Sequence, residues 1–181
     1  MNHTDMDLER LRYPMGRWQR QEGATAAERR SWIDAIAAAP LALRVAVTGL
    51  GDEQLDTPYR PGGWTARQLV HHVPDSHLNA YVRTCLALTE DRPTIRPYDE
   101  AAWAELGPAR TAPVEPSLAF LEALHERWVA LLRSLGDDAF ERPLSHPEIG
   151  MLTLTDLLSL YVWHGRHHAA HVTELRKRRG W

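Results

Sequence analysis

The sequence contains a single cysteine, Cys85, among its 181 residues. One thiol cannot form a disulfide within the chain, which argues against a disulfide-stabilised secreted domain and favours a reducing, cytoplasmic setting. Long apolar runs are also missing. The densest apolar stretch, residues 157–163, is far shorter than the ~20 residues of a membrane-spanning helix, and residues 1–12 lack the apolar core of a signal peptide. We therefore expect no membrane association.

An excess of positive charge is absent as well. The chain has 21 Lys and Arg against 24 Asp and Glu, a net charge of −3. Its one basic run, residues 176–179, falls where a helix is expected to end, and cations there complement the helix dipole. A nucleic-acid partner is therefore not expected. The length and the lack of repeats predict one domain over residues 1–181, with residues 1–23 as an irregular N-terminal arm.

Apolar periodicity and capping signals predict four long helices. The first follows the capping-box pair Thr25 and Glu28, and the second follows the pair Thr65 and Gln68 and runs to about residue 89. The third spans residues 117–135, and the last begins near residue 153 or 155 and runs to about 179. Pro40 and Pro74 fall inside the first two helices, where we expect bends because proline lacks an amide donor.

Two connections are informative. Residues 91–116 hold five prolines and predict a long loop, with a short helix near residues 99–106. Such a loop either covers a functional site or is a packed crossover, and the sequence leaves both open. Residues 140–152 predict a loop or a short β-hairpin. Four long helices and one long connection predict an all-α four-helix bundle.

The sequence HGRHHAAH, residues 164–171, gathers four of the ten histidines. At about 100° per residue, two i, i+4 pairs arise, and either could clamp a metal ion. His164 and His168 continue the spacing of the apolar residues Leu157, Tyr161, Val172 and Leu175. They are therefore expected to point into the bundle, and His167 and His171 toward its edge.

A metal ion needs at least a third ligand, and the second predicted helix offers His71 and His72, with Asp75 and His77 close by. Bundle metal sites are built in this way, from side chains on facing helices. The alternative is a group of hydrogen-bonded core and edge histidines that holds no metal, and spacing alone leaves both open. His125 and His146 are interpreted as structural or surface residues. Cys85, among apolar neighbours, is expected to be inert.

Several segments carry a resemblance to a known family. They are YPMG (13–16), GGWTARQLVHH (62–72), DSH (75–77), IRPYDE (95–100), HP (146–147) and YVWHGRHHAAHV (161–172). Together they resemble the DinB-like superfamily and, within it, the YfiT-type proteins regarded as metal-dependent hydrolases. The resemblance covers nearly the whole chain.

The resemblance implies an up-down-down-up four-helix bundle with a long crossover, and a homodimer. It also implies one divalent ion per chain, nickel or zinc, held by His72, His164 and His168. Pro74 departs from the family pattern, and a shifted bend there could re-aim the His72 imidazole. The site is expected to persist, because the missing amide donor belongs to residue 74 and not to the ligand. Related proteins are thiol S-transferases that use bacillithiol.

Three functions follow as hypotheses. In the first, the chain is a metal-dependent enzyme that activates a low-molecular-weight thiol, which then attacks an electrophilic substrate. In the second, the same ion activates water for hydrolysis, with Asp75 orienting a ligand or accepting a proton. In the third, the chain is a metal-binding stress-response or interaction module without turnover. No residue is assigned a catalytic role by sequence alone.

Overall fold

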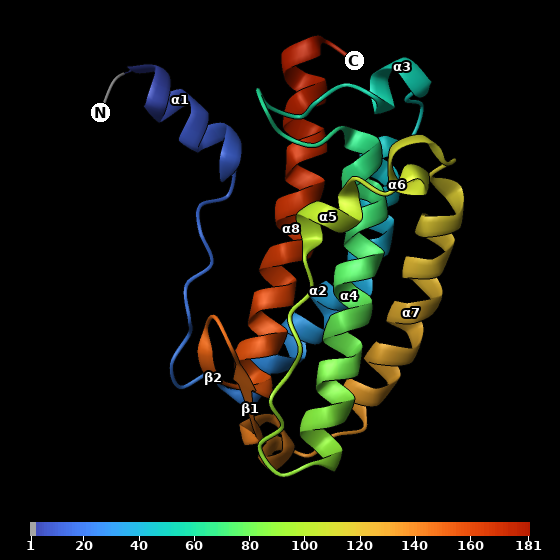
Figure 1. Cartoon of the computed structure of the whole chain (residues 1–181). Helices are drawn as coiled ribbons and strands as arrows, with labels where there is room; N and C mark the ends of the chain where they lie inside the picture. The colour runs from blue at the N-terminus through green and yellow to red at the C-terminus, as the bar shows by residue number, and fades with distance from the viewer. Residues whose placement is uncertain (1–2) are drawn as a thin grey trace.

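The computed structural model describes the backbone of residues 3–181 and the side chains of residues 8–181. Its centre is a bundle of four helices: α2 (Ala26–Val47), α4 (Ala66–Thr89), α7 (Glu115–Arg133) and α8 (Leu154–Arg179). In Figure 1, α2 and α8 run upward while α4 and α7 run downward, which confirms the expected up-down-down-up bundle. Among the described residues, no helix combines the length and the apolar character needed to cross a bilayer.

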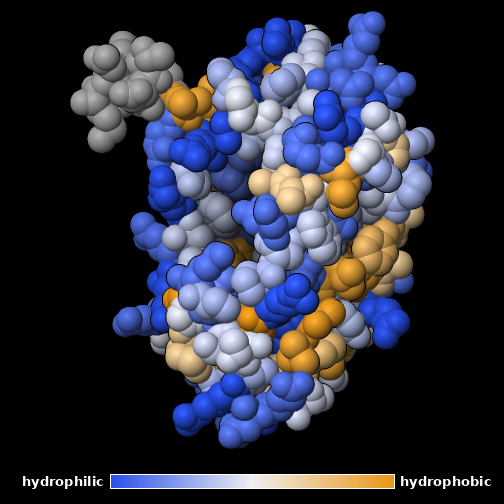
Figure 2. Space-filling model, in the orientation of Figure 1, coloured by the Kyte–Doolittle hydropathy of each residue, from blue (hydrophilic) through white to orange (hydrophobic). Residues whose placement is uncertain are grey.

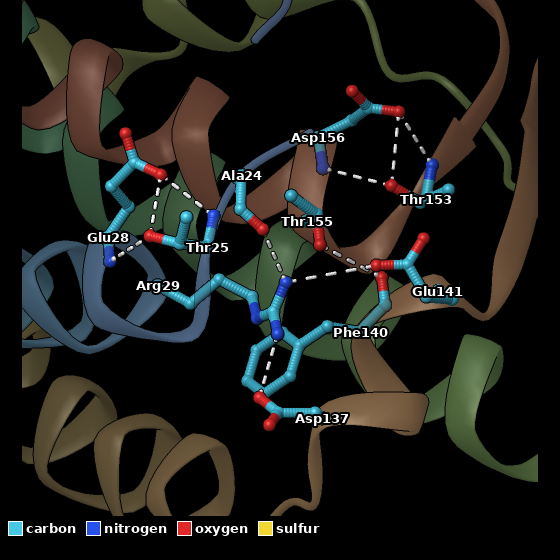
Figure 3. A network of polar contacts seen from close by, with 10 residues as sticks. All are labelled: Ala24, Thr25, Glu28, Arg29, Asp137, Phe140, Glu141, Thr153, Thr155 and Asp156. Atoms are coloured by element: carbon cyan, nitrogen blue, oxygen red, sulfur yellow. Dashed lines mark hydrogen bonds and ion pairs between the residues drawn. The ribbon is translucent and has the colours of Figure 1, made fainter. Parts of the chain in front are cut away.

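The bundle helices begin where the capping signals indicated. The side chains of Thr25 and Thr65 cap α2 and α4, and both capping boxes are complete. Thr153 caps α8 in the same way with Asp156. Each box satisfies two amides that a helix start leaves unpaired. Figure 3 shows the boxes of α2 and α8 together in one close view, and both helices begin at the lower end of the bundle in Figure 1.

Arg29 links the start of α2 to the segment that precedes α8, as Figure 3 shows. Its guanidinium is buried, donates a 2.8 Å hydrogen bond to the Ala24 carbonyl and forms a 2.7 Å ion pair with Asp137. Asp137 opens the short 3₁₀ helix η1 (Asp137–Glu141). The start of α2 is thereby tied to the segment that precedes the last helix.

The core follows the predicted apolar faces. On each helix the residues at i, i+3, i+4 and i+7 turn inward, so the four faces share one interior. The fully or almost fully buried side chains include Ile36, Leu43, Leu69, Val73, Ala80, Ala87, Leu121, Trp128, Leu157 and Val172.

The long connection between α4 and α7 is a crossover that runs the length of the bundle (Figure 1). It contains two short helices, α5 (Glu100–Ala104) and α6 (Gly107–Thr111). Its first part lies beside the predicted hairpin, which forms as β1 (Pro143–His146) and β2 (Gly150–Thr153). The Ile95 amide donates to the Ser145 carbonyl at 2.9 Å, and the Ser145 amide donates to the Pro93 carbonyl at 2.9 Å. A further short helix, α3 (Asp52–Leu55), follows α2.

The expected irregular arm needs a correction, because residues His3–Arg12 form helix α1. The sequence favours it electrostatically: acidic residues stand early in the segment, and Arg10 and Arg12 stand in its last turn. The rest of the arm is irregular and runs along α8. The Trp18 indole donates to Ser159 Oγ at 3.2 Å, and the Trp163 indole donates to the Gly16 carbonyl at 3.0 Å.

Candidate metal centre

Three histidines from two facing helices converge in the bundle. His72 of α4 and His164 and His168 of α8 each offer a ring nitrogen, and these nitrogens all lie within 4.8 Å of one another. The Nε2 atoms of His72 and His164 are 3.3 Å apart. The indole of Trp64 packs against the His72 ring, with 4.8 Å between ring centroids. The structure thus brings together the three residues expected as ligands.

The donor set suits a divalent metal ion. Two imidazole nitrogens on a tetrahedral ion, each about 2.0–2.1 Å from it, are about 3.3–3.4 Å apart, which agrees with the observed 3.3 Å. Burial lowers the pKa of His72 to about 4 and holds the pKa values of His164 and His168 well below the ordinary range. At neutral pH all three rings are therefore uncharged, which is the form that binds metals.

Behind His164 lies a chain of hydrogen bonds through two further histidines. Nδ1 of His164 is 3.1 Å from Nε2 of His77, and Nδ1 of His77 is 2.8 Å from Nε2 of His125. Nδ1 of His125 is 2.7 Å from the carbonyl oxygen of Ile36. His77 and His125 are fully buried, so this chain joins α8 to α4, α7 and α2 inside the core.

Only one arrangement of protons satisfies the hydrogen bonds that link His164, His77 and His125. The Ile36 carbonyl can only accept, so His125 carries its proton on Nδ1 and accepts with Nε2. Burial lowers the pKa of His125 to about 4 and that of His77 well below the ordinary value, so neither ring carries two protons at neutral pH. His77 must then donate from Nδ1 and accept at Nε2, and His164 must donate from Nδ1. The lone pair of His164 is left on Nε2, the atom that faces His72.

A cavity of about 610 Å³ opens beside the three histidines, a size suited to a small organic molecule. Its wall comes from α4, α8, the crossover, the hairpin and the N-terminal arm. Lining residues with polar groups include Arg12, Arg60, His72, Ser76, Arg83, Tyr98, Glu100, His146, Glu148, Tyr161, His164 and His168. The Ser76 hydroxyl lies 3.3 Å from Nε2 of His164. It therefore stands at the edge of the histidine cluster, which is the group of His72, His164 and His168.

The sequence profile of the DinB superfamily matches residues 35–172, which are most of the chain and include α4, α7 and the larger parts of α2 and α8. The chain belongs to the DinB superfamily. It is 51% identical to "Putative metal-dependent hydrolase YfiT" of Bacillus subtilis (strain 168) over 172 residues, which cover 94% of this chain and 97% of that protein. A "Putative metal-dependent hydrolase" of Bacillus cereus (strain 03BB102) is 52% identical over 171 residues, covering 94% and 98%.

A solved structure agrees with this assignment. YfiT from Bacillus subtilis, described as "a probable metal-dependent hydrolase with an unusual four-helix bundle topology", superposes with a TM-score of 0.93 at 50% sequence identity. The match covers 95% of this chain and 99% of that one. The fold expected from the resemblance is therefore confirmed, and the chain has relatives named for metal-dependent hydrolysis along almost its full length.

Within this DinB-superfamily bundle, His167 and His171 lie on the side of α8 that carries Trp163, as expected, but they are not at an exposed edge. Both are buried. The His171 ring stacks on Tyr59 with 4.1 Å between centroids, and His167 stacks on Trp163 at 4.4 Å. Nε2 of His171 also lies 3.2 Å from the carbonyl oxygen of Arg12. The N-terminal arm and the segment after α3 cover this side of α8, and helical phase alone cannot reveal that cover.

The structure distinguishes the candidate site residues on the second predicted helix, which is α4. His71 turns away from the cluster, because its Nδ1 lies 2.7 Å from Ser117 Oγ. Helix α4 continues through Pro74 without a break, and His72 lies in the group of three histidines, as expected despite the proline. Among the described side chains, the Asp75 carboxylate makes no hydrogen bond to the three histidines, and it does not line the cavity.

The structure also gives the positions of Cys85, His125 and His146, the other residues that the sequence analysis considered. Cys85 is half-buried on α4 and does not line the cavity. His146, expected to be structural or on the surface, is buried and lines the cavity, and His125 belongs to the hydrogen-bonded chain behind His164. The sequence analysis did not single out Ser76, Arg83, Tyr98 or Tyr161 as cavity residues.

Proposed function

We propose that the chain is a metal-dependent enzyme in which His72, His164 and His168 hold one divalent ion, nickel or zinc. The observation that carries the proposal is the convergence of three uncharged imidazoles within 4.8 Å beside a 610 Å³ cavity. Imidazole suits both metals, so the ligand set supports either one.

The chemistry of such a site follows from its charge. An ion held by three neutral imidazoles keeps its full +2 charge, and it favours loss of a proton from a thiol or a water molecule beside it. The protein supplies orientation. His77 fixes the tautomer of His164, and Ser76 places a hydroxyl at the edge of the cluster. Outer hydrogen bonds of this kind set ligand direction and basicity.

The first reaction we propose is transfer of a low-molecular-weight thiol, of the bacillithiol type, to an electrophile. The thiol gives its proton to solvent in the cavity, its sulfur forms a bond to the electrophilic carbon, and the leaving group departs with the electron pair of the broken bond. No described carboxylate makes a hydrogen bond to the three histidines or to Ser76, so a dedicated general base is missing at the cluster. This favours a thiol, which is a far stronger acid than water.

The second reaction is hydrolysis of an ester or amide. The names of the relatives support it. Glu100 and Glu148 support it too, because their side chains line the same cavity and could accept a proton from water that enters it. Asp75, the sequence-based candidate for that role, has no such position.

Metal content by elemental analysis tests the site. The wild-type protein is expected to hold about one divalent ion per chain, and His72→Ala, His164→Ala and His168→Ala are expected to hold none. His71→Ala is the matched control: it lies beside His72 and is equally buried, but its imidazole contacts Ser117. Loss of metal from the control alone, or no uptake by the wild type, would contradict the proposed ligands.

Activity assays with the metal-loaded protein separate the two reactions. Bacillithiol with a fluorogenic electrophile such as monochlorobimane reports thiol transfer, and a panel of esters and amides reports hydrolysis. His164→Ala is the inactive control in both. Bound metal with no turnover in either panel, together with a large fall in Tm on chelation, would support the non-catalytic metal-binding module instead.

The proposal includes a homodimer in a cytoplasmic setting. Exposed apolar side chains stand on α4 and α7, among them Leu78, Val82 and Phe120, and Figure 2 shows apolar surface over these two helices. The lone thiol of Cys85 suits a reducing compartment. Sedimentation of the wild type and of Val82→Glu tests the dimer, since a charge in an apolar interface should yield monomers.

A further inference from the structure

Arg83 is a buried charge without a charged partner. Its side chain lies in the wall of the cavity and is only 7% exposed. Nη1 lies 3.3 Å from the Tyr161 hydroxyl and Nη2 lies 3.4 Å from the Arg96 carbonyl, while Nε has no hydrogen-bond partner among the described residues. No carboxylate of the described side chains forms an ion pair with this guanidinium. A buried charge of this kind is costly unless something pairs with it.

A second unpaired donor lies in the same wall. The Tyr98 hydroxyl is buried close to the Ser76 hydroxyl, and it makes no well-aligned hydrogen bond among the described residues. Arg83 comes from α4, whereas Tyr98 comes from the crossover, so two distant parts of the chain bring unused donors to one cavity. Buried donors are almost always paired, and two that line the same space indicate a missing acceptor.

We propose that Arg83 and Tyr98 form a subsite for a carboxylate group of the substrate. The inference deepens the proposed function and depends on it, because it assigns the cavity to a substrate. The Nε edge of a guanidinium matches a carboxylate in size and shape, and the tyrosine hydroxyl can donate a further hydrogen bond. Glu100 and Glu148 also line the cavity, which disfavours a group with a higher negative charge, such as a phosphate.

Contacts through Ser76 and Tyr161 connect this subsite to the metal centre. Ser76 Oγ lies 3.3 Å from Nε2 of His164, and Arg83 follows Ser76 by seven residues on α4. The Tyr161 hydroxyl, which Nη1 of Arg83 contacts at 3.3 Å, belongs to a ring whose centroid lies 5.5 Å from that of His164. The subsite therefore adjoins the three histidines, and the structure favours small carboxylic acids whose flexible chain lets the reacting group reach the metal centre.

Two hydroxamic acids test this inference, because the hydroxamate group binds metal ions whatever the natural substrate is. One is the monohydroxamate of octanedioic acid, whose carboxylate stands at the far end of a flexible chain that can bend to reach both groups. The other is octanohydroxamic acid, which has the same chain length without the carboxylate. Calorimetric titration of the nickel-loaded wild type should give at least tenfold tighter binding of the carboxylate probe.

Variants assign that preference to residues. Arg83→Met should lose the preference while it keeps its nickel and its affinity for octanohydroxamic acid. Tyr98→Phe removes a single hydroxyl and should reduce the preference several-fold, and it decides the matter if Arg83→Met does not fold. Arg96→Met is the matched control, because only the carbonyl of this exposed residue contacts Arg83, and it should behave as the wild type.

The outcomes are distinct. Equal affinity of the wild type for both probes would overturn the carboxylate subsite and leave the metal site standing. A phosphonate probe that binds more tightly than the carboxylate, with the difference lost in Arg83→Met, would overturn the choice of carboxylate. Failure of nickel-loaded protein to bind either probe would overturn the open metal site itself, and this inference with it.

Discussion

Gly165 of α8 packs directly against Ala39 of α2. A Cβ atom at position 165 would lie 3.3 Å from Cβ of Ala39 and 3.6 Å from Cε1 of His77. The missing side chain therefore lets the two helices approach closely beside the imidazole chain that supports His164. A helix interior is an unfavourable place for glycine, so close packing explains its presence here.

The substitution Gly165→Val is expected to lower the free energy of unfolding by about 1–3 kcal/mol, because its branched side chain overpacks this contact. It should also weaken metal binding by displacing His77. Urea denaturation and metal titration measure the two effects. Ala39→Gly in the same chain should restore part of the lost stability, because it removes the atom that the valine meets. Additive effects of the two substitutions would contradict the contact.

His125 is expected to act on the metal site without touching it. His125→Phe leaves the Nδ1 proton of His77 without its acceptor, so the tautomer of His164 is no longer fixed. Metal affinity should fall about 10–100-fold, the range found when outer partners of metal ligands are removed. Competition with a chromophoric chelator measures it. His71→Phe, also a buried histidine but outside the chain, should keep wild-type affinity. Unchanged affinity in His125→Phe would show that the imidazole chain does not orient His164.

The metal-free protein is expected to lose stability as the pH falls from about 6.5 to about 4. Burial lowers the pKa values of His72 and His125 to about 4, whereas an unfolded histidine titrates near 6.5. Within this window the unfolded chain binds protons that the folded chain does not. Each such proton costs about 1.4 kcal/mol of stability per pH unit. Urea denaturation at pH 7, 6 and 5 with a chelator present tests this, and His125→Gln should show a shallower fall. Constant stability across the window would contradict the burial of uncharged rings.

Pro74 is expected to cost stability without affecting the metal site. The proline removes the amide that would bond the Val70 carbonyl, although α4 continues past it. Pro74→Ala restores this donor and should raise the free energy of unfolding by up to about 2 kcal/mol. Metal affinity should stay within about threefold of the wild type, because His72 already reaches His164. A gain in stability accompanied by a large change in affinity would show that the bend does set the His72 direction.

Sequence patterns within a few helical turns predicted the bundle helices and the inward direction of two histidines. Capping pairs predicted the starts of α2 and α4, and apolar spacing predicted the extent of the four helices to within a few residues, because both depend on residues within a few turns. Helix α7, for which no capping pair was found, begins at Glu115 and ends at Arg133, two residues before the predicted bounds of 117 and 135. The same spacing predicted that His164 and His168 turn inward. Spacing left the metal site itself open, and the choice of His72 as third ligand came from the resemblance.

Long-range contacts account for what the sequence analysis missed. His167 and His171 are buried because the N-terminal arm and Tyr59 pack over them. The role of His125 depends on the carbonyl of Ile36, which only the packing of α7 against α2 brings near. One signal was present: Arg83 stands three residues after Ala80 and four before Ala87, on the buried face of α4. An arginine at an inward position should prompt a search for its counter-ion.

The imidazole chain that ends at Ile36 has a consequence for proton movement. A relay that exports protons must end in a group that can give one up, and a peptide carbonyl has none to give. The hydrogen bonds that link His164, His77 and His125 therefore hold the rings in place and do not conduct protons out of the site. A proton released beside the three histidines has no exit through this chain of imidazoles, so we expect it to leave through the mouth of the cavity, past the proposed Arg83 and Tyr98 subsite.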